Sequence, residues 1–313
     1  MKKISVVICV YNEEPNIGPL SRQIMDALGD LPYEAIFVDD GSTDRTREEI
    51  LKIKDERFIL AALKRNYGQS SALQAGIDIA EGEYIVLIDG DLQNDPADIP
   101  GMLEMAEKED WDMVAGVRAN RKDGMFLRKV PSKIANYMIR QSTGIKMKDL
   151  GCTLKIFKKE VLKDIHIYGE LHRFIPVLIT LEGATRITQV DVNHRPRQFG
   201  KSKYNLGRTT RVMSDLMLML FFKKYLQRPM HFFGMLGIVT LLAGVLIDLY
   251  LLVLKLMGHD IWGKPLLFLG ILLVVAGIQF FTTGIIAELL MRTYYETQQK
   301  KPYRVRQVRN TKN

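Results

Sequence analysis

Short apolar runs alternate with amphipathic stretches over residues 1–205. Four of these runs are rich in β-branched side chains: Ile4–Val10, Ala35–Asp39, Tyr84–Asp89 and Met113–Val117. Runs of this length between helical patterns are typical of strands buried on both faces of a parallel sheet. The pattern therefore predicts an α/β domain with a mainly parallel sheet.

Two longer apolar stretches follow, Phe232–Leu254 with one charge and Leu266–Ala287 with none. At 1.5 Å per residue, each is long enough to cross a bilayer core of about 30 Å. A pair of buried core helices is the alternative, but apolar stretches of this length are unusual in soluble domains. We therefore expect a two-helix transmembrane hairpin.

Charge sets the expected orientation of the hairpin. The chain has a net charge of +8, and basic residues flank the two stretches: Lys223, Lys224, Arg228, Arg292, Lys300, Lys301, Arg304, Arg306, Arg309 and Lys312. The positive-inside rule then places the N-terminal domain and the tail in the cytoplasm. The expected divisions are a domain over 1–205, an amphipathic juxtamembrane segment over 206–229, the hairpin over 230–291 and a basic tail over 292–313. A core helix of the soluble domain is the alternative for the juxtamembrane segment.

Acidic residues follow three of the predicted strands. Asp89 and Asp91 are two residues apart, so in an extended chain they project to the same face. Carboxylate oxygens favour Mg²⁺ or Mn²⁺, although surface turns also use aspartate freely. Asp39 and Asp40 end a second strand, where ligands of open parallel sheets bind, and either can accept hydrogen bonds from a ribose or base. After the first strand, Tyr11 can flank a base and Glu13 can hold a ribose.

These motifs together resemble the family 2 glycosyltransferases, and within that family the branch that acts on polyprenyl phosphates. The matching segments are Val10–Glu13, Val38–Asp44, Asn66–Gln69, Asp89–Gln93, Gly116–Arg118, Leu150–Cys152, His172–Pro176, Phe199–Tyr204 and the hairpin. The resemblance extends over essentially the whole chain. It implies a GT-A type, Rossmann-like nucleotide-binding domain.

The resemblance also implies residue roles. Metal binding is expected of Asp89, Asp91 and Gln93, and nucleotide binding of Val10, Tyr11, Glu13, Asp39, Asp40, Gly68, Gln69, Asp89 and Gly90. Lipid-phosphate binding is expected of Arg118 and Arg128, and guanidinium is a natural bidentate partner of phosphate. The basic segment before the juxtamembrane helix adds Arg195, Arg197, Ser202 and Lys203 as further candidates, and a membrane-surface patch is the alternative for this segment. Asp149 and Arg173 are expected to position the acceptor and, with Asp89 and Asp91, to make up the catalytic set. For Arg118 and Arg128, a solvated surface charge is the alternative.

The implied reaction is an inverting transfer of a sugar from a nucleotide-sugar donor, by resemblance a UDP-sugar, to polyprenyl phosphate at the cytoplasmic membrane face. The product serves cell-envelope glycan modification, and the cofactor is Mg²⁺ or Mn²⁺. An ionised phosphate needs little help from a general base, so positioning and charge stabilisation dominate. One departure is that Cys152-Thr153-Leu154-Lys155 stands where mannose synthase relatives carry serine or aspartate, an aromatic residue and arginine.

Three other functions compete with this interpretation. A processive polysaccharide synthase uses the same nucleotide fold, but neither Trp111 nor Trp262 has the context of its Gln-x-x-Arg-Trp motif. A catalytically silent membrane scaffold is disfavoured because unpartnered buried carboxylates are costly. Nucleic-acid binding ranks last, since the positive charge clusters beside the hairpin. A homo-oligomer is an expectation from family habit alone.

Overall fold

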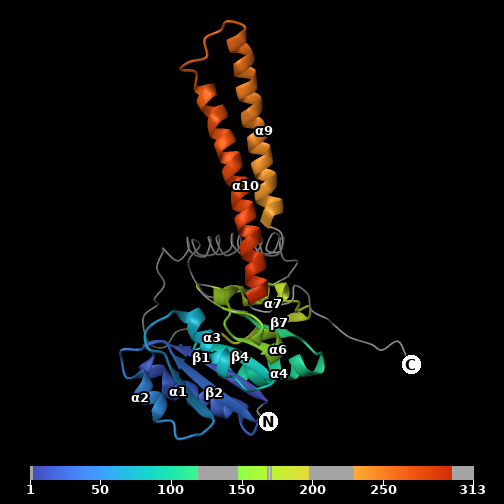
Figure 1. The fold of residues 1–313 in the computed structure, drawn as a ribbon. Coiled ribbons are helices and arrows are strands. Elements are labelled where there is room, and N and C mark those ends of the chain that lie inside the picture. The colour runs from blue at the N-terminus through green and yellow to red at the C-terminus, as the bar shows by residue number, and fades with distance from the viewer. Residues whose placement is uncertain (1–2, 119–146, 168, 170, 197–228, 298–313) are drawn as a thin grey trace, which may run out of the picture. The chain divides into compact units, whose positions relative to one another are not determined.

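The computed structural model describes residues 3–118, 147–167, 169, 171–196 and 229–297 (Figure 1). The chain divides into two compact units, Met1–Leu216 and Met217–Asn313. The first unit holds all the strands among the described residues, and the second holds two long helices. The expected juxtamembrane segment over 206–229 lies almost entirely outside the described residues.

The first unit is built on a seven-stranded sheet. Its strands are β1 (Ile4–Val10), β2 (Tyr33–Asp39), β3 (Phe58–Ala62), β4 (Tyr84–Asp89), β5 (Met113–Arg118), β6 (Lys155–Lys158) and β7 (Ile187–Val192). Their spatial order is β3-β2-β1-β4-β6-β5-β7. Only β6 runs antiparallel to its neighbours, β4 and β5, while the other pairs are parallel. The mainly parallel α/β sheet expected from the sequence is therefore confirmed.

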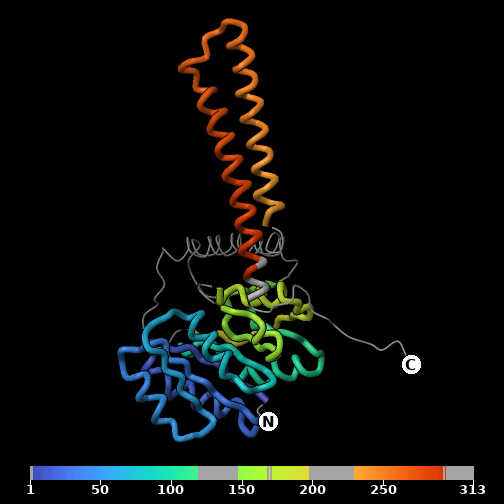
Figure 2. Tube along the Cα trace, in the orientation of Figure 1, coloured from blue at the N-terminus to red at the C-terminus, as the bar shows by residue number. Residues whose placement is uncertain are grey.

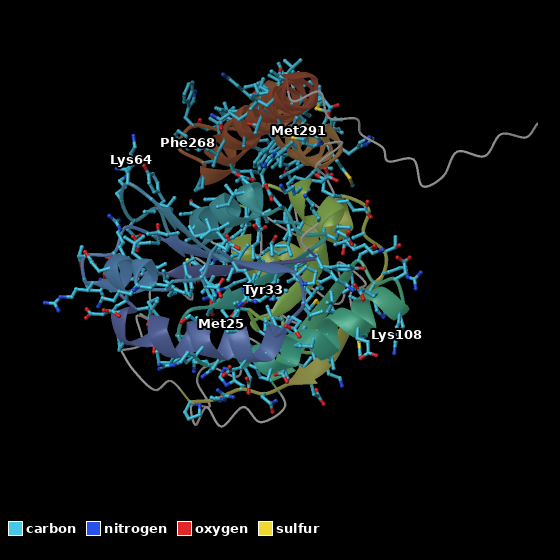
Figure 3. The ribbon with its side chains drawn as sticks, turned by 90° about the horizontal axis from the view of Figure 1, so that it is seen from below. Met25, Tyr33, Lys64, Lys108, Phe268 and Met291 are labelled. Atoms are coloured by element: carbon cyan, nitrogen blue, oxygen red, sulfur yellow. The ribbon has the colours of Figure 1, made fainter. Side chains whose placement is uncertain are left out.

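Helices cover both faces of this sheet. They are α1 (Glu14–Leu28), α2 (Thr46–Leu51), α3 (Gln69–Ile79), α4 (Ile99–Lys108), α6 (Lys159–Lys163) and α7 (Ile175–Leu181), with 3₁₀ turns η1 (Pro96–Asp98) and η2 (Leu171–Phe174). Helices α1, α2 and α4 share a core with one face of the sheet, and α3 packs on the other. Figure 3 shows the sheet between these helices, with Met25 of α1 labelled.

Helix α1 shows how sequence pattern becomes packing. Its apolar residues recur at three- and four-residue spacing, so Ile17, Leu20, Ile24 and Leu28 form one buried stripe. Pro15 near its start fits because the first helical N–H groups have no intrahelical partner. The stripe packs on alternate residues of β1 and β2, because successive strand side chains point to opposite faces.

On the opposite face, α3 approaches the sheet closely at one glycine. A Cβ added to Gly76 would lie 2.3 Å from a methyl carbon of Val7 and 2.9 Å from one of Val38. The absence of a side chain at Gly76 therefore sets the distance between α3 and strands β1 and β2. This contact also fixes the start of α3, which contributes to the site described below.

The second unit is a helical hairpin of α9 (Pro229–Leu256) and α10 (Pro265–Thr297), orange and red in Figure 2. Glycines line its interface, because an added Cβ at Gly237, Gly244 or Gly277 would lie within 3 Å of backbone atoms of the other helix. Only 17% and 11% of the most apolar windows are buried, which is unlike core helices of soluble proteins. By length and composition, both helices are candidate membrane spans.

We predict opposite effects for two glycine substitutions in helices. Gly76→Ala forces a methyl group into Val7 and should destabilise the first unit by about 1–3 kcal/mol. Gly101→Ala in α4 meets open space and should stabilise it by about 0.5–1 kcal/mol, because alanine loses less backbone entropy. Urea unfolding of the detergent-solubilised protein measures both. Equal effects of the two substitutions would contradict the close packing of α3.

Candidate functional site

Three parallel strands bring their polar ends to one edge of the sheet. In the strand register, Asp39 at the end of β2 lies opposite Val10 of β1, and Asp89 at the end of β4 lies opposite Cys9 of β1. The three polar segments expected from the sequence are therefore neighbours. This edge is where ligands of open parallel sheets bind.

Side chains join the loops that follow β1 and β2. The backbone N–H of Asn12 donates to the Ser42 hydroxyl at 2.9 Å, and the Asn12 side-chain oxygen accepts from the N–H of Thr43 at 2.8 Å. Asn12 has a φ of 53°, a left-handed conformation that asparagine tolerates better than most residues. The backbone N–H of Glu13 donates to the Thr46 hydroxyl at 2.9 Å. These bonds fix the positions of Tyr11 and Glu13, both partly buried beside the strand ends.

Asp39 and Asp40 have internal partners that sequence reasoning missed. The Asp39 carboxylate accepts from the Ser42 N–H at 2.9 Å and forms an ion pair with Arg47. The Asp40 carboxylate accepts from the backbone N–H groups of Tyr67 and Gly68, at 2.7 and 2.9 Å. Burial raises the pKa of Asp40, although these two hydrogen bonds oppose the shift. The two carboxylates therefore hold the loops that follow β2 and β3, in addition to any ligand that they bind.

The Asp89 carboxylate is held from two directions. The Gln69 side-chain amide donates to its Oδ1 at 2.9 Å, and the Thr153 hydroxyl donates to its Oδ2 at 2.5 Å. Gln69 is the first residue of α3, whereas Thr153 lies two residues before the start of β6. Asn94 also donates to the Thr153 hydroxyl, at 3.4 Å. The sequence marked Gln69, but nothing in its pattern indicated Thr153.

The chain turns immediately after Asp89, so it is not extended through Asp91 as the sequence argument assumed. Gly90 and Asp91 lie in a turn, and a Cβ at Gly90 would lie 2.5 Å from a methyl carbon of Val10. Leu92 is buried with a φ of 61°, a strained conformation of the kind that clusters at functional sites. Steric contact with β1 therefore shapes this segment more than strand periodicity does.

The donor set here fits a hard divalent cation. Asp89 and Asp91 supply carboxylates, and Gln93 supplies an amide oxygen, all ligand types that Mg²⁺ and Mn²⁺ accept. Among the described residues, no three His, Cys, Asp or Glu side chains gather as a metal cluster. Two carboxylates and an amide leave coordination positions for a ligand's own oxygens, which is typical of cations that bind phosphates.

Arg118 and Asp149 form a bidentate ion pair near the same edge. The Nε and Nη2 atoms of Arg118 donate to the two Asp149 oxygens at 2.7 and 2.9 Å, and both side chains are largely buried. Burial raises the pKa of Asp149, but the hydrogen bonds and charge of Arg118 outweigh it and hold the pKa below its usual value. Such a carboxylate is a weak base, so its geometry favours orienting Arg118.

The segment after β7 pairs with the segment after Asp91. The backbone N–H of Arg195 donates to the carbonyl of Gln93 at 2.8 Å, and Asn94 and His194 form an antiparallel bridge. The Arg195 guanidinium forms an ion pair with Asp95, a partner not expected from the sequence. Arg195 is thus placed close to Gln93, although these residues are far apart in the chain.

The remaining expected site residues are Arg173 and four candidates for phosphate binding. Arg173 lies in η2 and is partly buried. Its neighbour His172 is within 2.9 Å of the Ser70 hydroxyl through Nδ1, which ties η2 to the start of α3. Burial raises the pKa of the Cys152 thiol, in keeping with a packing role. The expected phosphate-binding residues Arg128, Arg197, Ser202 and Lys203 lie outside the described residues.

Comparison with known proteins defines the class of this fold and site. The family model Glycosyl transferase family 2 matches residues 5–166, and the chain belongs to that family. A second model, described as a domain of unknown function, matches residues 229–311. The protein is therefore a glycosyltransferase, with a family 2 domain followed by a segment that contains the two helices.

Particular relatives match nearly the whole chain. A dodecaprenyl-phosphate galacturonate synthase of Rhizobium johnstonii is 44% identical, over 98% of this chain and 93% of the relative. An undecaprenyl-phosphate 4-deoxy-4-formamido-L-arabinose transferase of Serratia proteamaculans is 36% identical, over 98% and 94%. A glucosyl-3-phosphoglycerate synthase from Mycobacterium tuberculosis, in complex with Mn²⁺, UDP-glucose and phosphoglyceric acid, is similar in fold, with a TM-score of 0.57. It is 19% identical and covers 71% of this chain and 79% of its own.

The ion pair of Asp149 makes a pH-dependent prediction. Because the folded state lowers its pKa, the pair stabilises the protein above the usual value of 3.8, and this contribution is lost as pH falls through the native value. Asp149→Asn should cost about 2 kcal/mol at pH 7, and the difference from the wild type should shrink toward zero in acid.

Urea unfolding at pH 7 and at pH 3 measures this difference. Asp55→Asn is the control, because it breaks the ion pair of Asp55 with Arg57 nearer the surface and should cost less than about 1 kcal/mol at pH 7. A penalty for Asp149→Asn that stays constant with pH would contradict the role of the charge.

Proposed function

We propose that this protein transfers a sugar from a nucleoside diphosphate donor to the phosphate of a polyprenyl phosphate. The observation that carries the proposal is the 149–153 turn, the five residues from Asp149 to Thr153. One end of this turn bonds Arg118, a candidate phosphate ligand, and the other bonds Asp89, a candidate metal ligand. Acceptor and donor groups are thereby held on one short stretch of backbone. The names of both relatives, which specify sugar transfer with prenyl phosphates, support the same reaction.

On the donor side, we assign Asp89, Asp91 and Gln93 to a divalent cation, Mn²⁺ or Mg²⁺. When bound, the cation neutralises charge on the departing nucleoside diphosphate as a Lewis acid. The loops held by Asn12 and Ser42 present Tyr11 and Glu13 to the nucleoside. The Mn²⁺ and UDP-glucose named with the M. tuberculosis structure support a cation and a uridine nucleotide here.

On the acceptor side, we assign Arg118 to the lipid phosphate, with Arg128, Arg195, Arg197, Ser202 and Lys203 as further candidates. Asp149 engages Nε and Nη2 of Arg118, which fixes the plane of the guanidinium. Arginine in a fixed plane is a strong and geometrically specific phosphate ligand. The phosphate oxygen is already ionised and attacks the anomeric carbon directly, so no protein base has to remove a proton. The new bond to the phosphate oxygen forms as the bond to the nucleoside diphosphate breaks.

We also propose that α9 and α10 span the membrane with the first unit and the C-terminal tail in the cytoplasm. The basic residues on both sides of the hairpin support this orientation. Alkaline phosphatase should be inactive when fused after residue 313 and active when fused within the connector, residues 257–264. The opposite activities would contradict the orientation.

The reaction itself is tested by the release of nucleoside diphosphate from the purified protein in detergent. UDP-galacturonic acid and UDP-4-deoxy-4-formamido-L-arabinose are the first donors, because the relatives' names specify these sugars. With Mn²⁺ and a polyprenyl phosphate, one donor should give lipid-dependent release. Asp91→Asn should lower the rate by about 100-fold or more, as loss of an electrostatic transition-state contact does.

The matched control is Asp78→Asn, the same change on the exposed side of α3. It should turn over at the wild-type rate. Release that does not depend on the lipid, or an Asp91→Asn variant with wild-type activity, would contradict the proposed function. Comparison of Mn²⁺ with Mg²⁺ in the same assay identifies the better cofactor.

A further inference from the structure

Lys155 is a buried cation beside the proposed site. It is the first residue of β6, opposite Leu87 of β4 and Ala115 of β5, and its exposed fraction is 3%. A buried ammonium group is costly unless hydrogen bonds and opposite charges compensate it. A lysine in the centre of a sheet therefore requires an explanation from its surroundings.

The Lys155 ammonium bonds the 149–153 turn. Its Nζ donates to the carbonyl oxygen of Cys152 and lies 3.5 Å from that of Leu150. These two carbonyls lie between Asp149, which pairs with Arg118, and Thr153, which donates to Asp89. Lys155 thus holds the middle of a segment whose two ends hold the acceptor and donor groups.

The charged groups around Lys155 also favour an ammonium group at this place. Burial lowers the pKa of the Lys155 ammonium, while Cys152, Asp149 and Asp89 act against that shift and Arg118 adds to it. The negative charges of Asp149 and Asp89 therefore favour an ammonium group here. Methionine is similar in length and unbranched but provides neither the charge nor the donors, so it isolates what the ammonium contributes.

We propose that Lys155 is a positioning residue for the transfer reaction, whose ammonium fixes the 149–153 turn and so sets Arg118 and Asp89 at their working separation. This role rests on the proposed function. Lys155 touches neither the donor nor the acceptor and acts through Asp149 and Thr153. Small errors in the placement of reacting groups reduce the rate more than they reduce binding.

The test compares Lys155→Met and Lys155→Arg with Lys158→Met. Lys158 is on the same strand but forms ion pairs with Asp110 and Asp112 and does not bond the 149–153 turn. Lys158→Met is therefore the matched control, because it removes a lysine from β6 and leaves the turn intact. Lys155→Met should lower kcat for lipid-dependent release by about 100-fold, with the affinity for UDP and Mn²⁺ in calorimetry changed by less than about threefold. Lys155→Arg keeps the charge and donors and should retain at least about a tenth of kcat. Lys158→Met should match the wild type in both measurements.

A double-mutant cycle tests the path through the turn. Thr153→Val removes the hydrogen bond to Asp89, so its effect on kcat and that of Lys155→Met should be strongly non-additive. Additive effects, or an unchanged kcat in Lys155→Met, would overturn the positioning role. The role would also be overturned if the Lys155→Met variant and a separate Lys155→Gln variant both failed to fold. That result would show that Lys155 is needed for the stability of the core and not for positioning.

The same assay separates this inference from the proposed function. If neither the wild type nor Lys158→Met shows lipid-dependent release, the proposed function fails and the inference fails with it. If the wild type and Lys158→Met both turn over and Lys155→Met has the same kcat, only the inference fails. A fall in kcat matched by an equal fall in UDP affinity also counts against it, since general damage to the fold lowers both.

Discussion

The two hydrogen bonds to the Asp89 carboxylate are the interaction on which the rest of the site depends. One comes from Gln69, 20 residues before Asp89, and the other from Thr153, 64 residues after it. Each donor is placed by a different part of the fold. The close contact of Gly76 with Val7 and Val38 positions α3 and hence Gln69, while the antiparallel insertion of β6 between β4 and β5 positions Thr153. The sheet order thus brings both donors to one carboxylate.

The insertion of β6 also explains why donor and acceptor groups can share a support. Strand β6 lies between β4, which ends at Asp89, and β5, which ends at Arg118. The turn before β6 therefore lies where it can contact the ends of both. From this turn, Asp149 accepts a hydrogen bond from Arg118, and Thr153 donates one to Asp89. The order of the strands therefore determines where the charged groups of Arg118 and Asp89 are held. A fully parallel sheet would not bring a turn to this place between the two strand ends.

The parallel strands, their acidic ends and the hairpin could be predicted from the sequence. The strands β1, β2, β4 and β5 are continuous apolar runs, because both of their faces are buried. The acidic strand ends and the hairpin follow from the same kind of pattern. Strand β6 could not be predicted in this way, because its four residues begin and end with lysine. The turn at Gly90 was also missed, since it depends on contact with Val10 rather than on local preference. Thr153 and Lys155 carry no signal of their own, and their roles depend on contacts made across the sheet.

The central claim is that Asp89 and Asp91 hold a cation that binds the donor diphosphate at the strand ends. A structure of the protein with UDP and Mn²⁺, with anomalous diffraction recorded at the manganese edge, tests it most directly. The account predicts one manganese peak shared by the UDP diphosphate and the carboxylates of Asp89 and Asp91, with the uridine beside Tyr11 and Glu13. A diphosphate bound only by arginine and lysine side chains, with no manganese at Asp91, would contradict it.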